Sequence, residues 1–176
     1  MPGEDTLTTV SMLPNELKNA KRLIYDNCGL TLTNLKLNTE SLEYEACSFE
    51  LNSKKIQYRL SKITPKKTGQ FVTIWKRNKD GITEPFNISD DLDFIIIAAK
   101  REDNFGHFIF PKSILADKGI ITTNTNEGKR GIRVYTPWDN VTNKQAEKTQ
   151  IWQTKYFFII DNVNTTSVDS IRKLLI

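Results

Sequence analysis

The sequence is poor in the residues that build disulfide frameworks, zinc sites and membrane spans. It has two cysteines, Cys28 and Cys47, and one histidine, His107, among 176 residues. Two cysteines are too few for a disulfide framework, and with a single histidine they do not make a structural zinc site of the usual kind. The longest aliphatic run, residues 94–99, is far too short to span a bilayer. These absences favour a reduced, cytoplasmic protein with no membrane segment.

Several catalytic signatures are absent as well. There is no G-x-S-x-G, no Walker A loop, no dinucleotide fingerprint and no catalytic cysteine motif. Residues 1–12 have no apolar stretch of the secretory type and are predicted to form a flexible leader. Residues 13–176 are enough for one domain with its own core. The sequence therefore gives more support to a binding function than to any particular reaction.

Acidic side chains are missing from residues 51–79, which we call the basic block. Its 29 residues hold nine lysines and arginines and no Asp or Glu. The rest of the chain has 16 of the 25 basic residues against all 21 acidic ones, so the net charge of +4 hides a concentrated cationic segment. Such asymmetry favours a polyanionic partner, and nucleic acid is the first candidate.

The hydrophobic pattern predicts a mixed α and β protein. A helix is expected over residues 14–27, then a hairpin of two strands within residues 46–63, a strand over 71–77, a fully buried central strand over 93–100, and strands at 107–110 and 132–138. Helices are expected over 112–119, 142–157 and the last ten residues. The fold class is α/β, bordering on α+β, with a mixed central sheet of about six strands flanked by helices.

Lys62 is singled out by its position in the basic block. If the strand from Ile56 continues past Leu60, Lys62 lies on the same apolar face, where an ammonium needs a partner or a task. The alternative is that the strand ends at Leu60 and Lys62 reaches water.

Other residues are candidates for contact with nucleic acid. Lys66 and Lys67 lie in a Gly- and Thr-containing turn that suits a phosphate, or is an ordinary solvated turn. Trp75, beside Lys76 and Arg77, is the best candidate for stacking on an unpaired base. The full set of predicted contacts is Arg59, Lys62, Lys66, Lys67, Trp75, Lys76, Arg77, Lys112, Lys129, Arg130 and Arg133.

Two carboxylates are candidate ligands for a hard cation. Glu50 lies in the strand before the basic one, and Asp93 begins the buried strand. With Lys62 they could hold Mg²⁺ or Mn²⁺ and position a water for phosphodiester cleavage. The simpler interpretation of Asp93 is an acidic turn before a strand, and that of His107 is a structural histidine.

The chain resembles the MepB-like family of bacterial proteins. The residues that carry the resemblance are SFEL (48–51), RLSKITPKKTGQFVTIWKR (59–77), EPFNISDDLDFII (84–96), HFIFPKSIL (107–115), GKRGIRVYTPWD (128–139) and QAEKTQIWQTKYF (145–157). The resemblance implies a fold similar to PD-(D/E)XK restriction endonucleases, and a nuclease site with Glu50 as first acid and Lys62 as lysine.

The chain departs from that nuclease pattern. The second acid should stand two residues before the lysine, where this sequence has Leu60. An alternative register, Gln57-Tyr58-Arg59, is a degenerate version, and a carboxylate such as Asp93 or Glu45 would have to come from elsewhere.

We therefore expect a nucleic-acid-binding protein of nuclease-like fold, with metal-dependent DNA or RNA cleavage as an open question. One alternative is an enzyme or sensor that binds a phosphorylated small molecule or nucleotide in a basic pocket. Another is a protein whose basic face docks an acidic protein partner.

Overall fold

A mixed six-stranded sheet forms the centre of the molecule, which is described by a computed structural model over residues 12–161 and 166–176. The order across the sheet is β1-β2-β3-β8-β9-β11. The strands are β1 (Leu32–Leu37), β2 (Cys47–Leu51), β3 (Lys54–Leu60), β8 (Phe94–Arg101), β9 (Asn104–Pro111) and β11 (Phe157–Ile159). Neighbouring strands are antiparallel except β3 and β8, which are parallel. The predicted fold class, α/β with a mixed sheet of about six strands and flanking helices, is confirmed.

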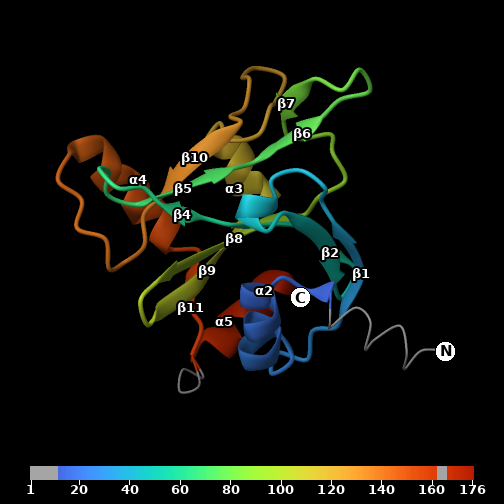
Figure 1. Cartoon of the computed structure of the whole chain (residues 1–176), viewed down its shortest axis with the longest axis vertical. Coiled ribbons are helices and arrows are strands. Elements are labelled where there is room, and N and C mark those ends of the chain that lie inside the picture. Colours follow the sequence, from blue (N-terminus) through green and yellow to red (C-terminus); the bar gives the residue numbers. More distant parts are fainter. Residues whose placement is uncertain (1–11, 162–165) are drawn as a thin grey trace.

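Two hydrophobic cores cover the two faces of this sheet. On one face pack α2 (Asn15–Ala20), the π-helical turn η1 (Lys21–Tyr25) and α5 (Thr166–Leu175). Figure 1 shows α2 and α5 side by side on that face. On the other face lie α3 (Lys112–Asp117), α4 (Lys144–Thr154) and two small sheets. The buried strand β8 contributes to both cores because alternate side chains point to opposite faces.

The small sheets are built largely from the basic block. One has the order β10-β5-β4, from β10 (Gly131–Val134), β5 (Gln70–Thr73) and β4 (Lys62–Ile63). The other pairs β6 (Trp75–Arg77) with β7 (Thr83–Pro85). The prediction of a single strand over residues 71–77 was wrong, because the chain changes sheets at Ile74.

The hairpin of β2 and β3 follows the sequence closely. Asn52 and Ser53 form its two-residue turn with φ angles of 46° and 73°, the left-handed backbone that tight hairpins require. The second strand ends at Leu60, because the backbone N–H of Ser61 still bonds to Ala98 O while Lys62 already pairs with Phe71 of β5. The expected continuation of this strand to residue 63 is therefore wrong.

The expected helices are present with shifted ends. The first one passes from α2 into η1, and its Leu17, Ala20 and Ile24 are buried as the spacing predicts. The helix expected over 142–157 is shorter, α4, with Asn143 as a cap whose side chain accepts from the Ala146 N–H. None of the helices in the described part of the chain is long and apolar enough to cross a membrane. The predicted leader lies, except for Met12, outside the described residues.

Candidate functional site

The folded chain distributes the basic block over three sheets, and acidic residues from elsewhere neutralise part of it. Lys62 Nζ lies 2.9 Å from a Glu43 carboxylate oxygen and 5.1 Å from the Tyr44 ring centroid. Lys76 Nζ lies 2.6 Å from Asp90 and 3.4 Å from Glu84. Although the basic block itself contains no acidic residue, some of its cations are therefore paired with carboxylates from other parts of the chain.

Other predicted cations are engaged in the same way. Arg77 Nε donates to both carboxylate oxygens of Glu40, at 2.7 and 2.8 Å, and its guanidinium lies 5.3 Å from the Trp75 ring centroid. Arg130 lies 3.7 Å from Glu127, and Lys112 Nζ donates to the carbonyl of Asp90 at 2.6 Å. Exposed ion pairs of this kind contribute little to stability, and the bond of Lys112 to a backbone carbonyl leaves its charge without a counter-ion in the described part of the chain.

Lys66, Lys67 and Lys129 remain exposed and have no acidic partner within the described residues. Lys66 and Lys67 lie in the turn between β4 and β5, and Lys129 lies in the loop before β10. Since β5 and β10 are paired antiparallel, both basic loops belong to the same small sheet, with Lys129 near the end of β5 and the Lys66–Lys67 turn before its start.

Arg133 of β10 holds the turn that carries Lys66 and Lys67. Its Nη2 donates to Thr64 Oγ1 at 2.6 Å and to the Gly69 carbonyl at 3.2 Å, while Nε donates to the Thr68 carbonyl at 3.2 Å. A side chain at Gly69 is excluded, because its φ is +81° and its Cβ would lie 2.7 Å from the Tyr135 ring. Arg133 thus positions the turn.

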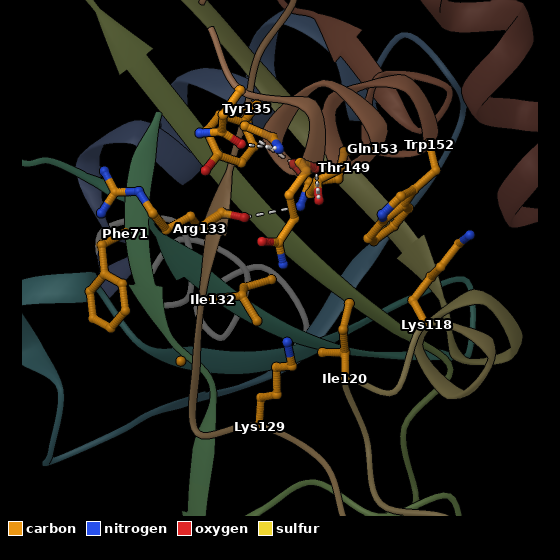
Figure 2. A pocket seen from close by; sticks show the side chains of 14 residues that line it. Phe71, Lys118, Ile120, Lys129, Ile132, Arg133, Tyr135, Thr149, Trp152 and Gln153 are labelled. Atoms are coloured by element: carbon orange, nitrogen blue, oxygen red, sulfur yellow. Dashed lines mark hydrogen bonds between the residues drawn. The ribbon is translucent and has the colours of Figure 1, made fainter. Parts of the chain in front are cut away.

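A pocket of about 440 Å³ opens between the β10-β5-β4 sheet, the end of α3 and one face of α4, and we call it the Lys129 pocket. Figure 2 shows Lys129, Lys118 and Trp152 around it, with Arg133 and Tyr135 on the strand side. None of its lining residues is acidic. They are Phe71, Lys118, Ile120, Lys129, Gly131, Ile132, Arg133, Tyr135, Asn143, Gln145, Ala146, Thr149, Trp152 and Gln153.

Aromatic rings and cations alternate in this pocket. The Trp152 ring packs 5.3 Å from Phe110 on its core side, and Lys118 Nζ lies 5.7 Å from the Trp152 ring centroid. Cations, rings and side-chain amides without a carboxylate suit an anionic ligand that carries a flat ring. Ala146, Thr149 and Trp152, spaced three residues apart along α4, are on the side of this helix that lines the pocket.

The buried Gln153 joins α4 to the edge of β10. Its amide nitrogen donates to Arg133 O at 3.0 Å, and its amide oxygen accepts from the Tyr135 N–H at 2.8 Å. Figure 2 shows these bonds as dashed lines. The glutamine occupies the place that a further strand would take, and it keeps the two walls of the pocket together.

The predicted catalytic residues are not brought together. Glu50, half-buried on β2, accepts from the Asn34 amide and stands opposite Lys55 of β3. Lys62 lies seven residues beyond Lys55, roughly 20 Å along an extended chain, and in another sheet. Glu50 and Lys62 therefore do not form the acid and lysine of a nuclease site.

Glu50 and Asp93, the two predicted metal ligands, both lie beside Lys55 of β3. Asp93 Oδ2 accepts from the Lys55 backbone N–H at 2.8 Å, so it holds a loop against β3. Within residues 12–161 and 166–176, no three His, Cys, Asp or Glu side chains gather closely enough to hold a metal ion. No catalytic step through Mg²⁺ or Mn²⁺ follows from this arrangement.

His107 lies on β9, opposite Ala98 of β8, and its side chain is fully buried. Its Nδ1 is 2.6 Å from the Tyr25 hydroxyl, and burial lowers the pKa of its imidazole to about 3. It is a neutral structural residue, as the sequence suggested.

Sequence reasoning missed Lys118 and Gln153 as members of the pocket. Lys118 follows a short helix and Gln153 lies one residue before the end of α4, so neither belongs to a motif. Tyr135 is one of the aromatic residues that the sequence interleaves with its cations, a pattern that stacking on bases would use.

Comparison with known proteins gives a family and a structural relative. The MepB-like family model matches residues 38–159. The crystal structure of MepB is 38% identical with a TM-score of 0.70, over 73% of this chain and 86% of that one. A bacterial homing endonuclease is 15% identical with a TM-score of 0.41, over 76% of this chain and 83% of that one, a likeness too weak to carry an argument. No curated protein matches the chain.

Proposed function

This chain belongs to the MepB-like family, and on that premise we propose that it binds nucleic acid, with an unpaired nucleotide in the Lys129 pocket. The observation that supports the proposal is the absence of any acidic side chain from the lining of a pocket that presents Lys118 and Lys129 together with Trp152 and Tyr135. Lysine side chains bind the phosphate groups of a nucleotide, and aromatic rings stack on its base.

Two further cations lie next to the pocket, just before the start of β5. Lys66 and Lys67 lie on the turn that Arg133 holds, next to the pocket, and they have no acidic partner among the described residues. A backbone that leaves the pocket along β5 would meet these two ammonium groups. Single strands are favoured over duplex because a base enters a pocket of this kind only when it is unpaired.

The test is a comparison of two lysine variants on neighbouring elements. Lys129→Met removes a cation from the pocket, whereas Lys148→Met removes an exposed one from α4 outside the lining. With a labelled single-stranded decamer, fluorescence anisotropy should show several-fold weaker binding for Lys129→Met and a salt slope smaller by about 0.7. Lys148→Met should bind as the unaltered chain does. Equal affinities for all three proteins would reject the site.

A second function is favoured by the size of the pocket. A volume of about 440 Å³ falls within the range of small-ligand sites, so the chain would bind a phosphorylated small molecule or a mononucleotide. In that case a mononucleotide binds as tightly as the decamer, and affinity does not grow with strand length. The proposal concerns binding, because Glu50 and Lys62, the predicted acid and lysine of a nuclease site, lie in different sheets.

A further inference from the structure

A second basic pocket lies on the polar face of β2 and β3, and a buried arginine forms its floor. Arg59 of β3 is only 2% exposed, and it lines this pocket of about 390 Å³ together with Phe86 and Trp75. We call it the Arg59 pocket. It shares no lining residue with the Lys129 pocket.

The guanidinium of Arg59 is poorly satisfied. Its Nη1 donates to the Tyr58 carbonyl at 2.8 Å, and its Cζ lies 5.9 Å from the Phe86 ring centroid. Its Nε is buried without a hydrogen-bond partner, and no carboxylate pairs with Arg59 in the part of the chain that the structure describes. A buried cation without a counter-ion is unusual, because its desolvation costs several kcal/mol.

Arg59 keeps its charge in this environment. Burial lowers the pKa of its guanidinium to about 10, which still leaves it protonated at neutral pH. The nearest titratable neighbour, the Cys47 thiol, is held neutral because burial raises its pKa to about 12. Arg59 is thus charged at neutral pH and has no counter-ion among the described residues. An anion that binds beside it would be held by a strong electrostatic attraction.

The rim of the pocket favours an anion as well. Lys36 on β1 is exposed and has no acidic partner among the described residues. The one acid in the lining, Glu40, is held by both of its oxygens on Arg77 Nε. Lys76 also lines the pocket, but Asp90 and Glu84 pair with it, so it adds no free charge.

We propose that the Arg59 pocket binds an oxyanion of the phosphoryl class, with the Arg59 guanidinium as its counter-ion. A phosphoryl oxygen satisfies the free Nε by a charge-assisted hydrogen bond, and Lys36 closes the site from the rim. The group comes either from a nucleic-acid backbone or from a free phosphomonoester. The site stands independently of the Lys129 pocket.

The test uses the thermal stability of the whole chain in inorganic phosphate against chloride at equal ionic strength. Phosphate should raise Tm by about 2–5 °C in a saturable manner, and the rise should disappear in Arg59→Met. Arg22→Met, which removes an exposed arginine of η1, should keep it. No rise in the unaltered protein, or an equal rise in Arg59→Met, overturns the proposal.

A second expectation separates this site from a purely structural arginine. If Arg59 only supported the fold, Arg59→Met would lower Tm in chloride. Because the variant removes a buried unpaired charge and keeps an apolar stem, its Tm in chloride should be unchanged or higher. Should the variant fail to fold, tungstate soaked into crystals of the unaltered chain decides: density at Arg59 Nε supports the site, and density elsewhere alone rejects it.

The source of the phosphoryl group follows from competition with the stabilising phosphate. If a thymidine decamer raises Tm and added phosphate then raises it no further, backbone phosphate is the ligand. Adenosine monophosphate that stabilises where adenosine does not, with no effect of the decamer, identifies a free phosphomonoester. Both results require Arg59. If neither ligand depends on Arg59, the pocket does not bind phosphoryl groups.

Discussion

Single residues in this fold show how strongly burial sets the chemistry of a side chain. His107, Arg59 and Cys47 are all buried, and in each of them burial moves the pKa by disfavouring the charged form. The sequence pointed to Lys62 as the residue under constraint. The structure places the constraint at Arg59 instead, three positions earlier and facing the other way.

His107 makes the stability of the protein depend on pH. Its pKa is about 3 in the folded chain and near 6.5 when unfolded, so below pH 6.5 protons bind the unfolded state preferentially. Stability is complete above pH 6.5 and falls as the pH drops toward 3. Between pH 7 and pH 5 the free energy of unfolding should fall by about 2 kcal/mol, measured by urea unfolding.

As the chain has one histidine, the assignment is direct. His107→Phe should have an unfolding free energy almost independent of pH between 7 and 5, whatever its absolute stability. A dependence as steep as that of the unaltered chain would contradict the role of His107.

At the scale of elements, the sequence predicts what local patterns control. The β2–β3 hairpin, the buried strand β8 and the helices follow from alternation, turn residues and apolar spacing. Two of the errors, at residues 61–63 and at Ile74, are places where a strand changes sheets. When a strand changes sheets, the alternation of its side chains continues, so the local sequence pattern does not show where the change occurs. The change is visible only in the pairing of these residues with the distant strands β8 and β10.

The junction of α4 and β10 depends on Gln153. Gln153→Leu keeps the volume but leaves the Arg133 carbonyl and the Tyr135 N–H unpaired, so we expect a loss of about 2–4 kcal/mol in unfolding free energy. Urea unfolding measures it. Gln145→Leu, on the same helix and exposed, should change stability by less than about 0.5 kcal/mol. Equal losses for both would mean that the amide does not hold the junction.

At the scale of the whole molecule, the sequence indicates a cationic site but does not indicate which residues belong to it. Composition indicated a cationic surface, and the fold does bring the two basic loops to one sheet. Which cations are free depends on acids far away in sequence, such as Glu40 and Glu43, and no local reading of residues 51–79 finds those pairs.

This difference between free and paired cations is testable. Replacing Lys66 and Lys67 together by Met should reduce the salt slope of single-strand binding by about 1.4 and weaken affinity accordingly. Replacing Lys62 and Arg77 together should change the slope by less, because their charge already serves Glu43 and Glu40. Anisotropy titrations across a range of salt concentrations measure both. If the second pair changes the slope as much as the first, charge pairing does not decide which lysines matter.

The parallel pairing of β3 with β8 has a consequence for how the chain folds. The two strands meet only after the chain between Leu60 and Phe94 has closed on itself, and that segment contains β4 and β5 of one small sheet and the whole β6–β7 pair. Hairpins β2–β3 and β8–β9 close short loops and should form first. The order predicts high φ-values within each hairpin and low ones at the β3–β8 seam, so the pockets would be the last part of the molecule to take shape.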